Sequence, residues 1–244
     1  MDIGLQDYKE QKKSISNFFP RFPSRPDFNG KIILEFGCGR GAFSFDIANE
    51  NPKKIVAIDT NSEYIKFAKK SLETNFSQHK NKISFICEDI NKWQSDYKFD
   101  YIITKEAFEH THNLPKVLNS MYELLNPKGK IFAGFGPLYN FFNGDHGYTK
   151  AILPWFHLIL PRNFLIKNIN KSRNNKINSI EQLGLNMYSL KQYENFFFNS
   201  KFNVIFFKTN CTSNKLAIPF KILSKIKFLE EYFTFNIFTV LEKR

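Results

Sequence analysis

Three glycines at alternate positions, Gly37, Gly39 and Gly41, follow the apolar run Ile32–Phe36. A second apolar run ends in Asp59, about twenty residues later. This layout predicts a nucleotide site in a parallel sheet, where a strand stops, the chain turns tightly and a helix begins with its N–H groups facing the ligand. Glycine suits such a turn because it tolerates positive φ and has no Cβ to block the ligand.

Asp59 adds information that the glycines alone lack. An acid at the end of the second strand can accept hydrogen bonds from both hydroxyls of a ribose. The spacing Gly37-x-Gly39-x-x-Ala42 also fits the dinucleotide fingerprint, and a glycine loop alone is weak support for any ligand. A plain strand–turn–helix junction without a ligand is the simplest alternative, but it does not require the acid. The pattern therefore indicates an adenosine-containing cofactor and leaves its identity open.

Residues suited to acid–base chemistry follow the apolar run 99–103. Glu106, Glu109 and His110 leave that run at its carboxyl end, where parallel sheets bind their ligands. We therefore expect them near the reactive end of the cofactor, where a carboxylate or an imidazole can accept a proton from a substrate.

A second candidate group is Asp145 and His146, which stand between two glycines. We expect His146, assisted by Asp145, to deprotonate or orient the substrate, because histidine titrates near neutral pH and an adjacent acid can raise its basicity. Glu109 or His110 is the alternative base. A metal site built from Asp145, His146, His110 and His112 is a further alternative. No tight ligand spacing supports it, so no metal is expected.

Apolar periodicity predicts the elements that position these residues. We expect strands at 31–36, 54–59, 83–87, 99–103, 130–135, 203–209 and 234–241. We expect helices at about 42–50, 62–75, 114–125, 189–199 and 216–231, with a turn at 126–129. Strands that alternate with helices imply an α/β fold with a doubly wound, Rossmann-like, mostly parallel sheet of seven strands. The last strand is expected to be antiparallel.

The length of 244 residues favours a single domain with an elaboration. Residues 1–30 read as a helical lead-in, and residues 137–188 as an insertion that caps the active-site end of the sheet. The apolar block 152–160 within it is either a buried cap helix or an apolar wall for a bulky or lipid-linked acceptor.

Composition narrows the class of partner. The net charge of +12 is mostly lysine and is not gathered in a dense tract, so nucleic-acid binding is not expected, although a basic surface favours an anionic substrate. No apolar run is long enough for a transmembrane helix, and the first residues lack a signal-peptide pattern. The three cysteines are far apart and form no ligand pairs, which favours a reduced, cytoplasmic setting.

With the whole order in view, the chain resembles the class I S-adenosylmethionine-dependent methyltransferases. The resemblance covers roughly residues 30–136, with weaker agreement at 190–241. The segments that carry it are Glu35–Gly41, Asp59, Glu88–Asp89, Phe99–Ile103 and Asn126–Lys130. The cofactor that it implies is S-adenosylmethionine.

By this resemblance, Gly37, Gly39 and Gly41 pass close to the methionine part of the cofactor, Asp59 holds the ribose and Asp89 holds the adenine amino group. The remaining cofactor-binding residues that we expect are Glu35, Cys38, Thr60, Ile90 and Lys105.

The leading hypothesis is O-methylation of a small molecule. The insertion also resembles methyltransferases of bacterial surface-polysaccharide and capsule clusters, through the segments Gly136–Tyr139, Gly144–Gly147 and Pro154–Leu158. That likeness implies a sugar hydroxyl or an anionic decoration on a sugar as the acceptor. The alternatives are an RNA or protein methyltransferase, a non-catalytic cofactor-binding scaffold and a nicotinamide oxidoreductase. Thr104–Ala107 stands where many amino-methylating nucleic-acid enzymes carry an Asn-Pro-Pro-Tyr-type tetrapeptide.

Overall fold

A seven-stranded sheet organises the chain, with its strands in the order β3-β2-β1-β4-β5-β7-β6. The computed structural model describes residues 3–149, 153–212 and 217–244. The strands are β1 (Ile32–Phe36), β2 (Lys54–Asp59), β3 (Ile83–Cys87), β4 (Phe99–Lys105), β5 (Leu125–Phe135), β6 (Phe202–Thr209) and β7 (Ile237–Lys243). Strands β1 to β5 pair in parallel, whereas β7 runs antiparallel to both of its neighbours. The predicted fold class is confirmed.

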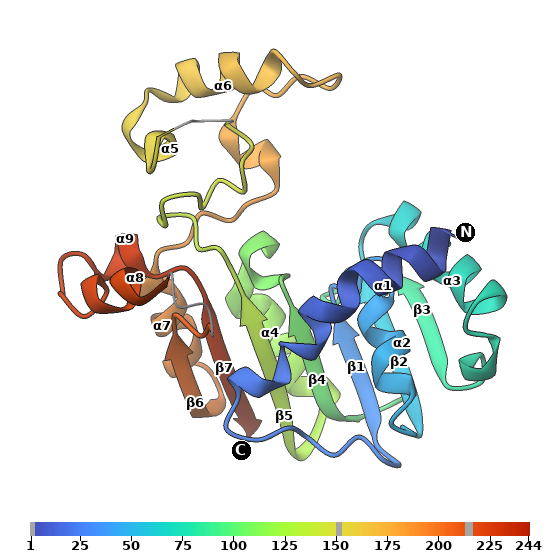
Figure 1. Ribbon diagram of the computed structural model, residues 1–244. Helices are drawn as coiled ribbons and strands as arrows, with labels where there is room; N and C mark the ends of the chain where they lie inside the picture. The colour runs from blue at the N-terminus through green and yellow to red at the C-terminus, as the bar shows by residue number, and fades with distance from the viewer. Residues whose placement is uncertain (1–2, 150–152, 213–216) are drawn as a thin grey trace.

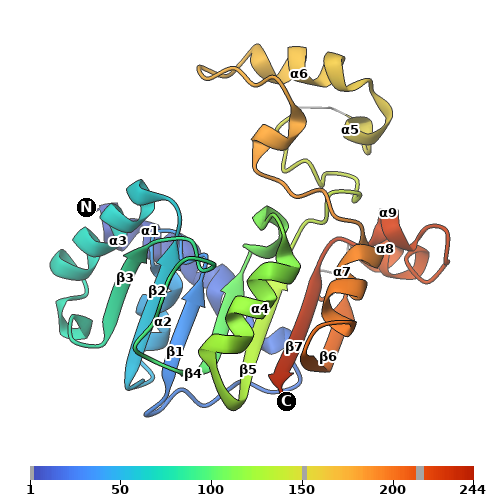
Figure 2. The same ribbon diagram turned by 180° about the vertical axis from the view of Figure 1, so that it is seen from behind.

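Helices cover both faces of this sheet (Figures 1 and 2). The α-helices are α1 (Ile3–Ser16), α2 (Ala42–Ala48), α3 (Ser62–Thr74), α4 (Leu114–Leu124), α5 (Phe156–Ile159), α6 (Arg162–Asn170), α7 (Leu190–Phe198), α8 (Ile218–Leu223) and α9 (Glu230–Phe233). Alternate strand residues point to opposite faces. Ile33 therefore packs with α1, α2 and α3, while its neighbour Leu34 packs with α4 and α7.

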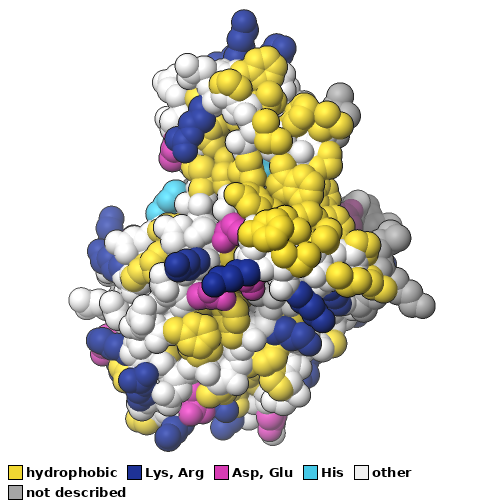
Figure 3. Space-filling view, turned by 90° about the vertical axis from the view of Figure 1, so that its left-hand side faces the viewer, with side chains coloured by type: hydrophobic (Ala, Val, Ile, Leu, Met, Phe, Trp, Pro, Cys, Tyr) yellow, Lys and Arg dark blue, Asp and Glu magenta, His cyan; other side chains and the backbone are white. Residues whose placement is uncertain are grey.

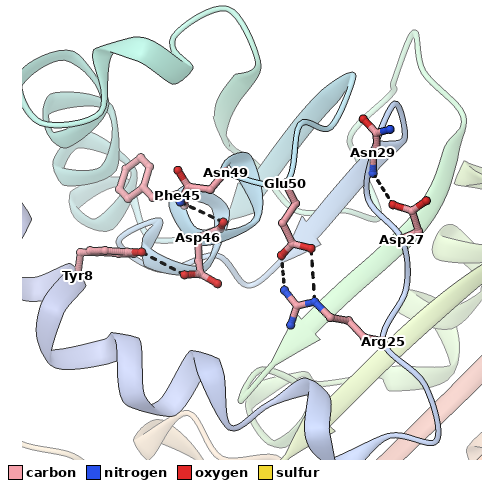
Figure 4. Close-up of polar contacts among 8 residues, drawn as sticks. All are labelled: Tyr8, Arg25, Asp27, Asn29, Phe45, Asp46, Asn49 and Glu50. Atoms are coloured by element: carbon pink, nitrogen blue, oxygen red, sulfur yellow. Dashed lines mark hydrogen bonds and ion pairs between the residues drawn. The ribbon is translucent and has the colours of Figure 1, made fainter.

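The N-terminal segment is fastened to α2 by polar contacts (Figure 4). The hydroxyl of Tyr8 on α1 donates to Oδ1 of Asp46 over 3.1 Å. Further along, the guanidinium of Arg25 pairs with Glu50 and lies 4.4 Å from the centre of the Phe19 ring. These contacts place α1 beside the glycine turn, where it forms one wall of the site.

The segment 137–188, here called the cap, stands beyond the carboxyl ends of the parallel strands (Figures 1 and 2). It contains α5, α6 and the 3-10 turn Ile180–Leu183. A small hydrophobic cluster of its own holds it together, with Leu165 and Ile169 of α6 packed against the turn. Residues 150–152 of this segment lie outside the described part.

The apolar block of the cap is not the buried helix that the sequence suggested. Its helix α5 has only 4 residues, because Pro154 and Pro161 bracket it. Leu153 and Ile159 are 54% and 71% exposed. Figure 3 shows hydrophobic side chains gathered on the upper part of the molecule.

Two other predicted elements are wrong at their boundaries. The predicted turn 126–129 lies inside β5, because Leu125 already pairs with Phe99 and a register shift absorbs the extra residues before Lys130. The predicted helix 216–231 is interrupted: α8 ends at Leu223 and α9 begins at Glu230. Residue 216 lies outside the described part. No described helix is long and apolar enough to cross a bilayer.

Candidate functional site

Four adjoining cavities follow the carboxyl edge of the sheet. The large cavity, of about 690 Å³, lies at the ends of β1 to β3. The α1 cavity, of about 360 Å³, shares Gly37, Gly39 and Glu106 with it. The central cavity, of about 270 Å³, shares Lys105 and Glu106 with the α1 cavity. The basic cavity, of about 310 Å³, meets the central cavity at Arg21.

The first two glycines of the turn have the geometry that the sequence predicts. Gly37 and Gly39 have φ of 72° and 50° and line the large and α1 cavities. A Cβ added at Gly39 would meet nothing within 4 Å, so this position keeps space free at the cavity wall. Cys38 lines the α1 cavity beside them.

Gly41 has a different role from the one expected. Its φ is 85°, and it caps the first turn of α2. A Cβ here would lie 2.6 Å from the ring of Phe85, so the glycine allows the turn to pack on β3. Gly41 lines none of the four cavities. The structure therefore does not place it beside a ligand.

Asp59 ties the end of β2 to the glycine turn. Its Oδ2 accepts a 2.8 Å hydrogen bond from Gly39 N–H, and its Oδ1 accepts one of 2.8 Å from Asn61 N–H. Asn61 in turn caps α3. Asp59 and Thr60 line the large cavity.

Asp89 and Ile90 line the large cavity from the end of β3. Oδ1 of Asp89 accepts hydrogen bonds from the backbone and side chain of Asn91, over 2.9 and 3.0 Å. Asp59 and Asp89 thus bound one cavity, as the motif predicts. The cavity therefore holds one carboxylate that can accept hydrogen bonds from ribose hydroxyls and a second that can accept one from an exocyclic amine.

Glu35 is the buried carboxyl of the α1 cavity. It is 4% exposed and accepts a hydrogen bond from the hydroxyl of Ser44. Burial raises the pKa of Glu35 to about 8. The side chain is therefore largely protonated at neutral pH, and a cation bound in this cavity would favour its ionised form.

Glu106 lies where three cavities meet. It lines the large, α1 and central cavities, and its backbone is left-handed, with φ of 54°. Non-glycine residues in this region are uncommon and cluster at functional sites. Its Oε2 lies 2.8 Å from Nζ of Lys105, and its backbone N–H donates a 2.9 Å hydrogen bond to the Gly134 carbonyl oxygen. Of the predicted acid–base residues, Glu106 has the best access to a substrate.

The predicted Asp145–His146 pair is not formed. The Asp145 carboxylate accepts a 2.9 Å hydrogen bond from Thr149 N–H and also bonds to the Thr149 hydroxyl. Burial lowers the pKa of His146, and the nearby His110 lowers it further. Asp145 therefore stabilises its own loop, and although its charge raises the pKa of His146, burial and His110 outweigh this effect.

His146 faces the protein rather than a cavity. Its Nε2 lies 3.3 Å from the carbonyl oxygen of Pro137, and its ring centre lies 5.3 Å from that of His110. His110 does line the large cavity, as does His112, while Nδ1 of His110 lies 2.9 Å from the Gly184 carbonyl oxygen. His110 and His146 therefore lie side by side, and His110 is the one that faces the large cavity.

Glu109 is buried beneath the site. It is 3% exposed, and its Oε1 accepts a 3.2 Å hydrogen bond from Gly136 N–H, while Oε2 has no recorded partner. Burial raises the pKa of Glu109 to about 8. A protonated carboxyl that lines none of the four cavities is not suited to act as the substrate's base.

Sequence reasoning missed several cavity residues. Gly144 does not leave room for a ligand, because a Cβ added there would lie only 2.1 Å from the carbonyl oxygen of Leu138. The loop instead sends Tyr148 to the large cavity. Arg40, inside the glycine turn, lines the α1 cavity and pairs with Asp7 over 3.1 Å. The position of Arg40 within the glycine motif was a signal that could have identified it as a cavity residue. Tyr148 lies too far from that motif in the sequence to be predicted in the same way.

Within the described residues, no group of three histidine, cysteine, aspartate or glutamate side chains is placed to hold a metal ion.

Comparisons with known proteins agree with this geometry. Residues 27–134 match the family described as a methyltransferase domain. A malonyl-[acyl-carrier protein] O-methyltransferase of Priestia megaterium is 31% identical over 132 residues, which cover 53% of this chain and 46% of that protein. A phosphoethanolamine N-methyltransferase of Caenorhabditis elegans is 26% identical over 130 residues, 53% of this chain and 28% of that protein. The chain thus spans about half the length, or less, of these relatives.

Solved structures share the fold across nearly the whole chain. An S-adenosylmethionine-dependent methyltransferase from Mesorhizobium loti has a TM-score of 0.59 at 12% identity, covering 96% of this chain and 97% of that one. Phosphoethanolamine N-methyltransferase 2 of Haemonchus contortus, in complex with S-adenosyl-L-methionine, has a TM-score of 0.61 at 14% identity, covering 95% and 52%. The Haemonchus contortus structure thus holds the cofactor that the sequence predicts for this chain. Residues 27–134 thus match a methyltransferase domain, and the seven-stranded sheet has the fold of S-adenosylmethionine-dependent methyltransferases of known structure.

Proposed function

We propose that this protein transfers a methyl group from S-adenosylmethionine to an oxygen atom of a small acceptor. The observation that carries the proposal is the large cavity, in which the glycine turn, Asp59 and Asp89 meet at the ends of three adjacent parallel strands.

The residues present fit the cofactor. Asp59 offers carboxylate oxygens to a ribose, Asp89 an acceptor to an adenine amino group, and Gly39 open space at the cavity wall. Glu35 in the α1 cavity would pair with an ammonium group, which would hold its carboxyl in the charged form. The cofactor supplies an electrophilic sulfonium methyl. The protein must align the acceptor, exclude water and remove a proton where the acceptor has one.

The central cavity is the best place for the acceptor. It adjoins the α1 cavity at Lys105 and Glu106, and its walls combine Phe18, Phe135 and Phe141 with Asn143 and Asn236. The Asn143 amide can bind a hydroxyl group, whereas the Asn236 amide bonds to the Cys211 backbone, and apolar walls keep water out.

Glu106 is our proposed base. Its carboxylate stands between the central cavity and the two cavities assigned to the cofactor, so it can reach an acceptor hydroxyl there. His110, which lines the large cavity, is the second choice. His146 would act only if the cap moved it into a cavity.

The acceptor's identity is a proposal of its own. The malonyl-[acyl-carrier protein] relatives support an oxygen acceptor, but they match only about half of this chain. The resemblance of the cap to polysaccharide-cluster enzymes favours a sugar hydroxyl or an anionic decoration on a sugar. Both acceptor types present an oxygen nucleophile on a polar, often anionic molecule.

Two measurements test this function. Calorimetry should show S-adenosylhomocysteine binding and no comparable binding of NAD. Conversion of S-adenosylmethionine should then be followed with malonyl thioesters, nucleotide sugars, phosphoethanolamine and RNA as separate acceptors. Binding of NAD without binding of S-adenosylhomocysteine would overturn the assignment of S-adenosylmethionine as the cofactor. Binding with no turnover on any acceptor would favour the scaffold alternative.

A further inference from the structure

Positive side chains gather at the far end of the row of cavities, away from the glycine turn. The basic cavity is lined by Arg21, from the segment after α1, by Lys208 near the end of β6 and by Lys221 of α8. Asn17 adds an amide group, whereas the amide of Asn210 in the cavity wall bonds to Ser224, Phe233 and Phe235. No carboxylate is among the described residues that line it, so three parts of the chain bring one sign of charge to one cavity.

The three cations line the cavity together with Cys211. Burial raises the pKa of the Cys211 thiol, but Lys208, Arg21 and Lys221 all oppose this by their charge. Their charges therefore act on the same side chain in the cavity wall. Within the described part of the chain, none of the three is in a recorded ion pair.

Arg21 and Lys221 are held in place by other contacts. The Arg21 guanidinium carbon lies 5.1 Å from the centre of the Phe238 ring, at the start of β7. Nζ of Lys221 donates a 2.8 Å hydrogen bond to the Thr212 carbonyl oxygen, which is one of the three hydrogen bonds that an ammonium group can donate. A partly fixed cation loses less conformational entropy when it binds an anion.

We propose that the basic cavity binds a phosphoryl group carried by the methyl acceptor. Arg21 lines both the basic and the central cavity, so an acceptor with its nucleophilic oxygen beside Glu106 can extend its phosphoryl group to Lys208 and Lys221. Guanidinium and ammonium groups are the usual protein partners of phosphate oxygens. This inference rests on the proposed function, since it assigns the phosphoryl group to the acceptor.

Calorimetry at low ionic strength tests the site without any turnover. The probes are inorganic phosphate, glycerol 3-phosphate as a monoester and a simple dialkyl phosphate as a diester. The variants are Lys208→Gln alone and Lys208→Gln with Lys221→Gln. The matched control is Lys225→Gln with Lys227→Gln, which removes the same charge from exposed lysines that do not line the cavity.

We expect at least one of the two esters to bind, and the double variant to weaken that binding by about tenfold. Lys208→Gln should give part of this loss, which guards against a local folding defect caused by losing the Lys221–Thr212 hydrogen bond. The control pair should bind as the wild type does. S-adenosylhomocysteine affinity should be unchanged in all variants, because none of these lysines lines the large or α1 cavity.

Three results would overturn the inference. Equal weakening in the control pair would mean that net charge alone attracts the anion. Binding of inorganic phosphate without either ester would mean a site for free anion instead of an acceptor. No binding of any probe would mean no anion site. If the wild type does not bind S-adenosylhomocysteine, the proposed function is refuted. The phosphate titrations would still show whether the basic cavity binds an anion.

Discussion

The backbone N–H of Gly39 donates a 2.8 Å hydrogen bond to Oδ2 of Asp59. This contact joins the turn after β1 to the end of β2, and it holds the carboxylate at the wall of the large cavity. Asp59 therefore both shapes the turn and offers charge to a ligand.

Asp59→Asn should weaken S-adenosylhomocysteine binding by about 10- to 100-fold, because hydrogen bonds to a charged group contribute about 1.5–3 kcal/mol each. Asparagine keeps the shape and one acceptor oxygen, so the fold should survive. Calorimetry is the measurement, with the exposed Asp96→Asn as control. Unchanged affinity in Asp59→Asn would remove Asp59 from the cofactor site.

Glu106→Gln should lower turnover by about 10²-fold while S-adenosylhomocysteine affinity stays within a few-fold, because general-base catalysis contributes about 10²–10⁴-fold. His146→Ala should change turnover much less, since its ring lies against Pro137 and His110. The comparison uses initial rates on the acceptor found in the screen. A larger loss of turnover in His146→Ala than in Glu106→Gln would show that His146 of the cap, and not Glu106, is the base.

Glu109 should make the folded state less stable as the pH rises. Its folded pKa is raised by burial from 4.5 to about 8, so between these values the folded state keeps a proton that the unfolded chain has released. Its contribution is favourable below pH 4.5 and is lost as the pH rises toward 8.

Glu109→Gln should therefore raise the free energy of unfolding at pH 8 by an amount on the order of 2 kcal/mol relative to wild type, with little gain at pH 5. Urea unfolding at the two pH values measures this, with the exposed Glu73→Gln as control. An equal effect at both pH values would show that Glu109 is not the titrating group.

Gly41 and Gly147 offer a matched pair for separating backbone strain from crowding. Both have positive φ, 85° and 75°, but only Gly41 has a neighbour, Phe85, at its Cβ position. Gly147→Ala should cost about 1 kcal/mol from the backbone alone. Gly41→Ala should cost about 2–4 kcal/mol, because overpacking adds about 1–3 kcal/mol. Similar midpoints in urea would show that Phe85 moves aside freely.

The sequence predicted the first four strands within two residues, and the interiors of β1 and β2 are buried on both faces. Their apolar runs are long, and Gly37 or Asp59 marks where such a run stops. The start of β5 was missed, because Asn126, Pro127 and Gly129 are turn formers. There, pairing of Leu125 with Phe99 outweighs local preference.

The site was predictable where one motif carries it and not where distant segments meet. Spacing points to Gly37, Gly39 and Asp59, and the family resemblance adds Asp89. The orientation of Asp145 toward Thr149 depends on how its loop closes, which adjacent residue types do not reveal. Arg21 and Lys208 are far apart in sequence, so only the folded chain shows that they line one cavity.

Because β7 lies between β5 and β6, the last of the seven strands to be synthesised is the one that joins the sheet together. A nascent chain that has not reached Ile237 leaves one edge of β5 without its partner, and β6 has no strand to pair with. Unpaired edges invite association with other chains. We therefore expect residues 237–243 to govern solubility during synthesis, although they line none of the cavities apart from Phe238.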